Sequence, residues 1–198
     1  MTHRIDNILV SGVGGQGVIL ATDVIAEVFL RARFEVKKSE VHGMSQRGGS
    51  VVSHVRRGEE VHSPLIPAGN VDVLLAMESI EALRYVHTLK TDGFVIYDPV
   101  RIPPQAVTTG QSRYPADVQR RLKRHSDRVY RIPAGQIAAE LGNSRVPNTV
   151  LLGALSVILD ICSDLWVEAL VDRVPEGAAE INVRALESGR QIMKQLGG

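Results

Sequence analysis

A short glycine-rich turn near the N-terminus holds the residues best suited to bind an anionic ligand: Gly12, Gly14, Gly15, Gln16 and Gly17. The turn follows an apolar run, residues 7–11, that predicts a buried strand, and it precedes residues 18–30, whose apolar side chains recur at helical spacing. Glycines let a ligand approach the backbone, and N–H groups at a helix start attract anions. The turn therefore predicts a phosphate site. The alternative is a turn that only packs the helix on the sheet.

The spacing of Gly12, Gly14 and Gly17 matches the dinucleotide fingerprint, which makes NAD(P) one candidate ligand. Such a site also needs an acidic residue about 20 residues further on, at the end of the second strand, to bind the ribose. Glu35 and Glu40 stand near that distance, but Glu35 falls inside the predicted strand 33–38. A stand-alone Rossmann-type NAD(P)-binding protein is therefore the second hypothesis.

A polar segment at residues 40–50 contains a second set of candidate ligand-binding residues: Glu40, Ser45, Arg47, Gly48 and Gly49. We expect this segment to form a loop beside the crevice at the carboxyl ends of the strands. Arg47 could bind a carboxylate or phosphate through two parallel hydrogen bonds, and the two glycines would allow close approach. An interface loop in which Arg47 pairs with Glu40 is an equally good interpretation.

The chain lacks the residue types that redox chemistry requires. Cys162 is its only cysteine, so it can form neither an intrachain disulfide nor an iron–sulfur cluster of its own. We expect Cys162 to be an inert thiol in an apolar helix. The six histidines show no metal-ligand spacing, and Ser45 has no nearby base, so we predict no metal site and no catalytic residue acting in this chain alone.

Composition favours a cytoplasmic globular protein. The 198 residues are 44% hydrophobic and 23% charged with a formal net charge of +1, which gives no general attraction to nucleic acid or anionic membranes. The N-terminus lacks the apolar region of a signal peptide, and the longest apolar stretch, residues 150–162, is too short to span a bilayer. The basic run at residues 120–124 is interpreted as the solvated face of a helix.

The order of the predicted elements indicates an α/β fold: a Rossmann-like, mostly parallel sheet flanked by helices, with a β-hairpin addition. Strands are predicted at 7–11, 33–38, 71–76, 94–98 and 129–133, and the hairpin at 50–56 and 61–64. Helices are predicted at 18–30, 79–89, 115–125, 134–141, 148–161 and 176–196. The helix at 148–161 is nearly all apolar, so it should be buried in the core or under a partner.

Three motifs in this order resemble the gamma-type subunits of 2-oxoacid:ferredoxin oxidoreductases. They are the glycine turn from Gly12 to Gly17, the loop from Ser39 to Gly49, and the segment from Pro147 to Ala154 that contains Asn148. The likeness spans nearly the whole chain and is strongest to the small subunit of the indolepyruvate enzymes. It implies one gamma-type domain over residues 1–198.

In that family, the assembled enzyme decarboxylates a 2-oxoacid on thiamine diphosphate, passes electrons through iron–sulfur clusters to ferredoxin and releases acyl-CoA. The resemblance implies that thiamine diphosphate and the clusters belong to a larger partner subunit, which agrees with the single cysteine. This chain would then help bind coenzyme A, with Arg47 contacting its phosphates or the substrate carboxylate and Gly14–Gly17 shaping the crevice. Asn148 also matches a family position. Alone, the chain should be inactive.

Overall fold

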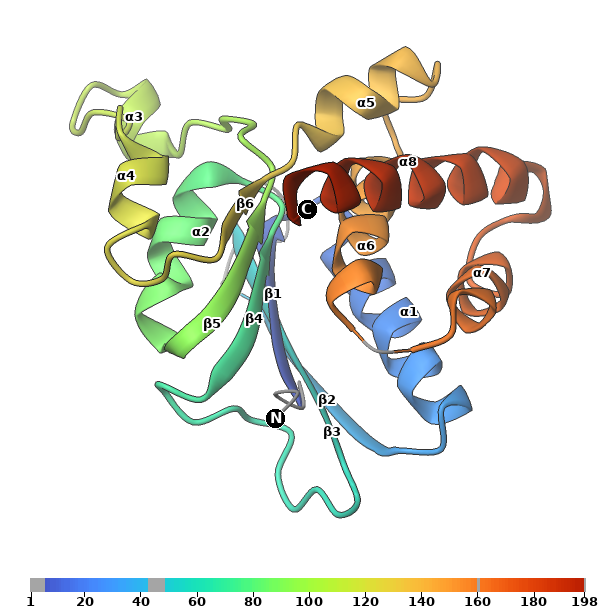
Figure 1. Ribbon diagram of the computed structural model, residues 1–198. Helices are drawn as coiled ribbons and strands as arrows, with labels where there is room; N and C mark the ends of the chain where they lie inside the picture. The colour runs from blue at the N-terminus through green and yellow to red at the C-terminus, as the bar shows by residue number, and fades with distance from the viewer. Residues whose placement is uncertain (1–5, 43–48, 160, 198) are drawn as a thin grey trace.

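A six-stranded sheet forms the centre of the computed structural model, which describes residues 6–42, 49–159 and 161–197 (Figure 1). The strands are β1 (Asn7–Val13), β2 (Glu35–His42), β3 (Ser50–Gly58), β4 (Val71–Ala76), β5 (Leu89–Tyr97) and β6 (Val129–Arg131). Their order across the sheet is β2-β3-β1-β4-β5-β6. Every residue of β4 is buried, as expected for a central strand that is covered on both faces.

The sheet is mostly parallel, which confirms the predicted α/β class. β1, β4, β5 and β6 pair in parallel, whereas β3 runs antiparallel to both of its neighbours, β1 and β2. β2 therefore runs in the same direction as β1 without contacting it. The first two predicted strands belong to one strand–helix–strand unit, but β3 lies between them.

The predicted pairing of residues 50–56 with residues 61–64 is wrong. β3 pairs instead with β2, from Glu35 opposite Gly58 to His42 opposite Val51. Residues 61–64 form no strand, because His62 and Ser63 are exposed side by side rather than alternating between two faces. The antiparallel addition to the sheet is thus the β2–β3 pair.

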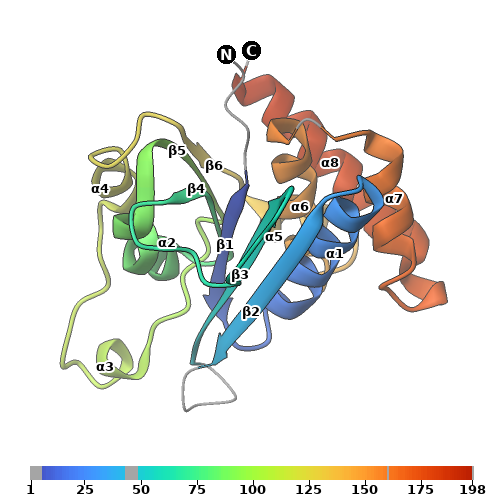
Figure 2. The same cartoon turned by 90° about the horizontal axis from the view of Figure 1, so that it is seen from below.

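Helices cover both faces of the sheet (Figures 1 and 2). They are α1 (Val18–Arg31), α2 (Ser79–Tyr85), α3 (Gln105–Thr108), α4 (Val118–Leu122), α5 (Ala134–Glu140), α6 (Pro147–Ile158), α7 (Ser163–Val171) and α8 (Ala179–Gly197), with short 3-10 helices η1 (Val86–Thr88) and η2 (Glu176–Ala178). The larger apolar core lies between the sheet and α1, α6, α7 and α8. A smaller core lies under α2 and α4.

Several helix boundaries differ from the predictions. The helix predicted at 79–89 ends at Tyr85, and the one predicted at 115–125 shortens to α4. The sequence did not predict α3 or α7. The prediction that Cys162 lies in an apolar helix is wrong, because α6 ends at Ile158, Leu159 is extended, and Cys162 is exposed at the start of α7.

α6 and α8 pack closely through two glycines. A Cβ atom on Gly153 would lie 2.0 Å from the Leu186 carbonyl oxygen, and one on Gly189 would lie 1.9 Å from the Val150 carbonyl oxygen. The backbones therefore touch at this crossing. The apolar surface of α6 is buried within the chain, as predicted, and α8 supplies much of the cover. Within the described ranges, no helix combines the length and apolarity needed to cross a membrane.

Candidate binding site at the glycine turn

Gly17 ends the glycine turn and caps α1 in a conformation that few other residues adopt. Its φ and ψ angles, 80° and 29°, are left-handed. A Cβ atom on Gly17 would also lie 2.5 Å from Nδ2 of Asn148, at the start of α6. Both the backbone conformation and the space therefore require glycine here. The result is that the first turns of α1 and α6 meet, although they are far apart in the sequence.

Gln16 closes the turn from inside rather than extending into solvent. Its Oε1 accepts a hydrogen bond from the Val13 N–H at 2.7 Å, and its Nε2 donates one to the Met77 carbonyl oxygen at 2.7 Å. A Cβ on Gly12 would come within 3.1 Å of the same Oε1 and of Met77 Cβ. Gln16 thus ties the carboxyl end of β1 to the segment that follows β4, and Gly12 leaves room for it.

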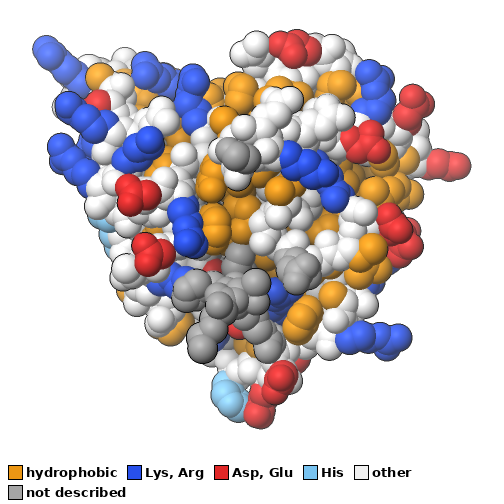
Figure 3. Space-filling view, in the orientation of Figure 1, with side chains coloured by type: hydrophobic (Ala, Val, Ile, Leu, Met, Phe, Trp, Pro, Cys, Tyr) orange, Lys and Arg blue, Asp and Glu red, His pale blue; other side chains and the backbone are white. Residues whose placement is uncertain are grey.

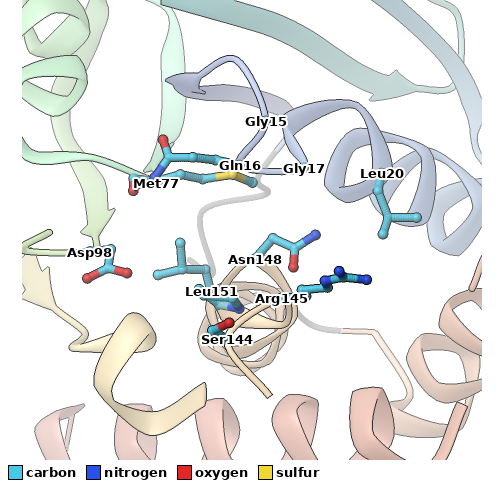
Figure 4. Close-up of a pocket in the computed structure, with 11 residues that line it drawn as sticks. Gly15, Gln16, Gly17, Leu20, Met77, Asp98, Ser144, Arg145, Asn148 and Leu151 are labelled. Carbon is cyan, nitrogen blue, oxygen red and sulfur yellow. Dashed lines mark hydrogen bonds between the residues drawn. The ribbon is translucent and has the colours of Figure 1, made fainter. Parts of the chain in front are cut away.

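A cavity of about 500 Å³ opens between the glycine turn and the start of α6. Its lining residues come from the turn, from the ends of β4 and β5, and from the α5–α6 connection: Gly15, Gln16, Gly17, Leu20, Met77, Asp98, Ser144, Arg145, Pro147, Asn148 and Leu151. Figure 4 shows the Asn148 and Arg145 side chains extending from the start of α6 toward α1, with Asp98 on the opposite side. We call this space the turn cavity.

Asn148 is the most informative residue of the turn cavity. It is only 5% exposed, and it lines the cavity beside Gly17. No group in residues 6–42, 49–159 or 161–197 forms a hydrogen bond with its side-chain amide. The side chain is mostly buried, but its amide faces the cavity and is open to solvent there. A polar ligand in the turn cavity would provide the missing partner.

Two helix starts and one arginine give one side of the cavity a positive potential. Neither α1 nor α6 carries an acidic side chain in its first turn. The partial positive charge of each helix start is therefore not neutralised there. Arg145 adds a full charge on an exposed side chain. This side of the turn cavity can bind an anion such as a phosphate.

Asp98 forms the opposite wall and is held by the backbone. Its two carboxylate oxygens accept hydrogen bonds from the N–H groups of Val100, at 3.1 Å, and Gly135, at 3.0 Å. Burial raises the pKa of Asp98 above its ordinary value, and the two hydrogen bonds only partly offset that effect. The carboxylate orders the segments that follow β5 and β6. Its charge also keeps anions on the Arg145 side.

A second hollow, of about 320 Å³, lies on the other side of the same turn. It is mostly apolar and is lined by Val13, Gly14, Gly15, Gly17, Val18, Ile19 and Val51. Gly15 borders both spaces, has φ of 102°, and would have open space around an added Cβ. The glycine turn therefore separates the turn cavity, whose lining is partly polar, from a mostly apolar hollow.

The predicted site residues separate into those that meet at the turn and those that do not. Gly14 donates its N–H to the Gly49 carbonyl oxygen at 2.9 Å, which joins the turn to the start of β3. Glu40 lies near the end of β2 and accepts a hydrogen bond from Lys38 at 2.8 Å. Glu35 lies at the opposite end of β2, where it accepts the Val61 N–H. Neither acidic residue lines the turn cavity.

Three predicted residues, Ser45, Arg47 and Gly48, lie outside the described residues, so their roles stay predictions. In the part of the chain that is described, no group of three or more His, Cys, Asp or Glu side chains could hold a metal ion. Sequence reasoning missed Arg145, Asp98 and Met77. The one available signal for Arg145 was its position in the sequence, two residues before the Pro147–Ala154 motif that contains Asn148.

The fold is that of an α/β subunit with a cavity at its glycine turn, and sequence comparison assigns its family. Residues 7–192 match the model of the pyruvate ferredoxin/flavodoxin oxidoreductase family, so the chain belongs to that family. Among its relatives is the indolepyruvate oxidoreductase subunit IorB of Thermococcus kodakarensis. The two are 38% identical over 197 residues, which cover 97% of this chain and 98% of the relative.

Two solved structures have the same fold. The gamma subunit of a keto/oxoacid ferredoxin oxidoreductase from Geobacter sulfurreducens is 24% identical with a TM-score of 0.72, covering 96% of this chain and 99% of that one. The 2-oxoglutarate:ferredoxin oxidoreductase from Magnetococcus marinus is 25% identical with a TM-score of 0.74, covering 96% of this chain but 31% of that chain. The protein is thus a small subunit of a multi-subunit 2-oxoacid:ferredoxin oxidoreductase.

Proposed function

We propose that this chain is the small subunit of a thiamine-diphosphate-dependent 2-oxoacid:ferredoxin oxidoreductase that forms acyl-CoA and CO₂, and that its turn cavity binds the phosphate-bearing part of coenzyme A. The observation that carries this proposal is the Asn148 amide, which has no hydrogen-bond partner among the described residues and faces a cavity bordered by two helix starts and Arg145. Phosphate oxygens would accept hydrogen bonds from Asn148, from Arg145 and from backbone N–H groups of the glycine turn.

Coenzyme A suits the cavity because it joins phosphates to an arm that alternates apolar segments with amide groups. Leu20, Met77 and Leu151 supply apolar surface next to the polar side of the cavity. The Magnetococcus marinus enzyme has coenzyme A and succinyl-CoA bound. Arg47, in the loop between β2 and β3, is proposed as a further contact for the phosphates or for the carboxylate of the 2-oxoacid.

Thiamine diphosphate and iron–sulfur clusters do not fit the described residues of this chain. Thiamine diphosphate would supply the decarboxylation chemistry, and the described ranges hold no group of three or more His, Cys, Asp or Glu side chains for the divalent cation that would accompany its diphosphate. A cluster normally needs four ligands, mostly thiolates, and the chain has one cysteine. We therefore assign both groups to the larger subunit, with ferredoxin as the electron acceptor of the complex. Indolepyruvate or another arylpyruvate is the proposed substrate because of the IorB relatives.

The geometry disfavours the stand-alone NAD(P)-binding hypothesis. In a dinucleotide site, the acidic residue that binds the ribose stands at the end of the strand next to the glycine turn. Here that neighbour is β3, which runs antiparallel, while Glu40 lies one strand further away and Glu35 lies at the far end of β2. Neither Glu35 nor Glu40 is therefore placed to bind a ribose beside Gly12.

Titration of coenzyme A into the assembled complex tests the proposal. Arg145→Gln is expected to weaken coenzyme A binding about tenfold, because a charged hydrogen bond to phosphate contributes about 1.5–3 kcal/mol and this site is partly solvated. Arg184→Gln, which removes an exposed arginine from α8, should leave binding unchanged. Pantetheine, which has no phosphate, should bind wild type and Arg145→Gln equally, and NADH should not compete. Equal coenzyme A affinity in wild type and Arg145→Gln would exclude this cavity as the phosphate site.

A further inference from the structure

The charges of this chain are unevenly distributed. Between Arg101 and Arg131 there are eight Arg and Lys residues against two Asp, although the formal net charge of the whole chain is +1. All eight are exposed, and we call them the basic surface: Arg101, Arg113, Arg120, Arg121, Lys123, Arg124, Arg128 and Arg131. The rest of the chain therefore carries a net negative charge. Figure 3 shows blue side chains gathered at the upper left, where Figure 1 has α3 and α4.

The basic surface is separate from the turn cavity. Apart from Arg128, which lies over the Phe94 ring at the larger core, it lies along α3, α4 and the end of β6, on the side of the sheet that α2 covers. The turn cavity lies on the side of α1 and α6 (Figures 1 and 2). The buried side chains Val118 and Leu122 fix α4 on the smaller core. Arg120 forms an ion pair with Asp117 at 2.5 Å.

The backbone beneath the basic surface is held in place. Glu78, which is 1% exposed, accepts hydrogen bonds from the Ile102 N–H at 3.0 Å and from the Tyr114 hydroxyl. The Arg101 guanidinium lies over the Tyr114 ring, 5.2 Å from its centroid. A hollow of about 380 Å³ opens here between Arg101, Arg120 and Arg131. It has the size and charge to take carboxylate side chains of a partner.

We propose that the basic surface is the docking site for the acidic face of the protein electron carrier that exchanges reversibly with the complex. This inference rests on the proposed function, in which the complex passes electrons to a protein acceptor. A permanent subunit interface has an apolar centre depleted in charge. From residue 99 to residue 131, which the structure describes in full, the large apolar side chains that are well exposed are Val100 and Ile102, both 36% exposed. Such a surface fits a transient, electrostatically steered encounter.

A protein partner fits this surface better than a nucleic acid. Seven of the eight basic residues are arginines, which bind carboxylates through two parallel hydrogen bonds and are enriched in protein interfaces. Single-stranded nucleic acids also need exposed aromatic rings on which bases stack. The aromatic residues of this stretch, Tyr114 and Tyr130, are partly buried, and Tyr130 stacks on Phe94.

Charge reversal on the assembled complex tests the proposal with ferredoxin as the probe. Lys123→Glu/Arg124→Glu should raise the KM for ferredoxin about tenfold or more at low ionic strength and reduce its dependence on salt. The matched control, Arg184→Glu/Lys194→Glu on α8, makes the same change in formal charge and should change the KM less than twofold. Turnover with a small viologen acceptor should be equal in all three proteins, and its absence in wild type would contradict the proposed function rather than the docking site. Equal ferredoxin KM values in wild type and the Lys123→Glu/Arg124→Glu variant would overturn the proposal.

Amine labelling separates the docking site from other uses of the surface, because Lys123 is the one lysine in it. In the assembled complex, Lys123 should react readily and become protected when ferredoxin is added, while Lys194 should not change. Protection of Lys123 before ferredoxin is added would place the larger subunit on this surface and overturn the proposal. Protection by RNA but not by ferredoxin would overturn it in favour of nucleic acid.

Discussion

Gly189→Ala is expected to lower the free energy of unfolding of this chain by about 3 kcal/mol or more, at the upper end of what overpacking a buried site costs. The new methyl group would lie 1.9 Å from the Val150 carbonyl oxygen, which belongs to the backbone of α6 and cannot rotate away. Gly153→Ala should behave alike, because its Cβ would lie 2.0 Å from the Leu186 carbonyl oxygen. Either change must push α6 and α8 apart, and these helices cover the larger core.

Urea denaturation of the full chain measures this effect, and Gly177→Ala is the matched control. An added Cβ at Gly177 meets nothing within 4 Å, so this change should alter stability by about 0.5 kcal/mol or less. In a helix free of contacts, Gly→Ala would stabilise by about 0.5–1 kcal/mol. A stabilised Gly189→Ala variant would therefore contradict the close backbone contact between α6 and α8.

Asn148→Leu is expected to separate ligand binding from stability. If the Asn148 amide exists to bind a ligand, leucine should change the stability of the free chain by about 0.5 kcal/mol or less, because the amide has no partner in the described structure and is open to solvent in the cavity. In the assembled complex, the same change should raise the KM for coenzyme A at least about tenfold, because one ligand hydrogen bond is lost and a polar cavity becomes apolar.

Two measurements decide the role of Asn148: urea denaturation of the free chain, and the KM for coenzyme A in the complex. Ser156→Ala, elsewhere on α6, is the control for a buried polar side chain that already has a partner, the Gly153 carbonyl oxygen at 2.7 Å. Ser156→Ala should lower the free energy of unfolding and leave the KM for coenzyme A unchanged. A large loss of stability in Asn148→Leu with an unchanged KM would show that Asn148 serves the fold and not a ligand.

The local parts of the site were predictable from the sequence, and the long-range parts were not. The glycine turn could be placed between β1 and α1 because glycine spacing and apolar periodicity are local signals. Asn148 was identified only through the family resemblance. That Asn148 touches Gly17, or that Arg145 lines the same cavity, depends on how α6 packs beside α1, which no local pattern encodes.

The strand order shows the same limit. Alternating apolar and polar residues correctly predicted a strand at β3. Its partner was predicted to be the segment that follows it in the chain, but its partner is the preceding strand, β2. Residues 61–64 lie outside the sheet, and the Val61 N–H binds the Glu35 carboxylate instead of a neighbouring strand. α7 was missed because the apolar run before it was read as one helix to Ile161, whereas the chain turns at Leu159.

The net charge of the whole chain did not reveal the basic surface, because basic and acidic residues nearly balance over the sequence. A formal net charge of +1 suggested that the basic run at residues 120–124 is an ordinary solvated face, an interpretation that still stands as the alternative to docking. Only the folded arrangement brings Arg101 and Arg131 to the same hollow as Arg120. Charge counted over a whole chain therefore says little about any one of its surfaces.

The subunit role is tested most directly by measuring coenzyme-A-dependent oxidation of a 2-oxoacid, with a viologen acceptor, by this chain alone, by the larger subunit alone and by the two combined. This chain has a cavity at the glycine turn, which we propose binds an anion, but it has a single thiol and, in its described residues, no group of three or more His, Cys, Asp or Glu side chains that could hold a metal ion. We expect no turnover by this chain alone and full activity only in the mixture. Sustained 2-oxoacid oxidation by the isolated chain, or a larger subunit whose rate this chain does not change, would contradict that role.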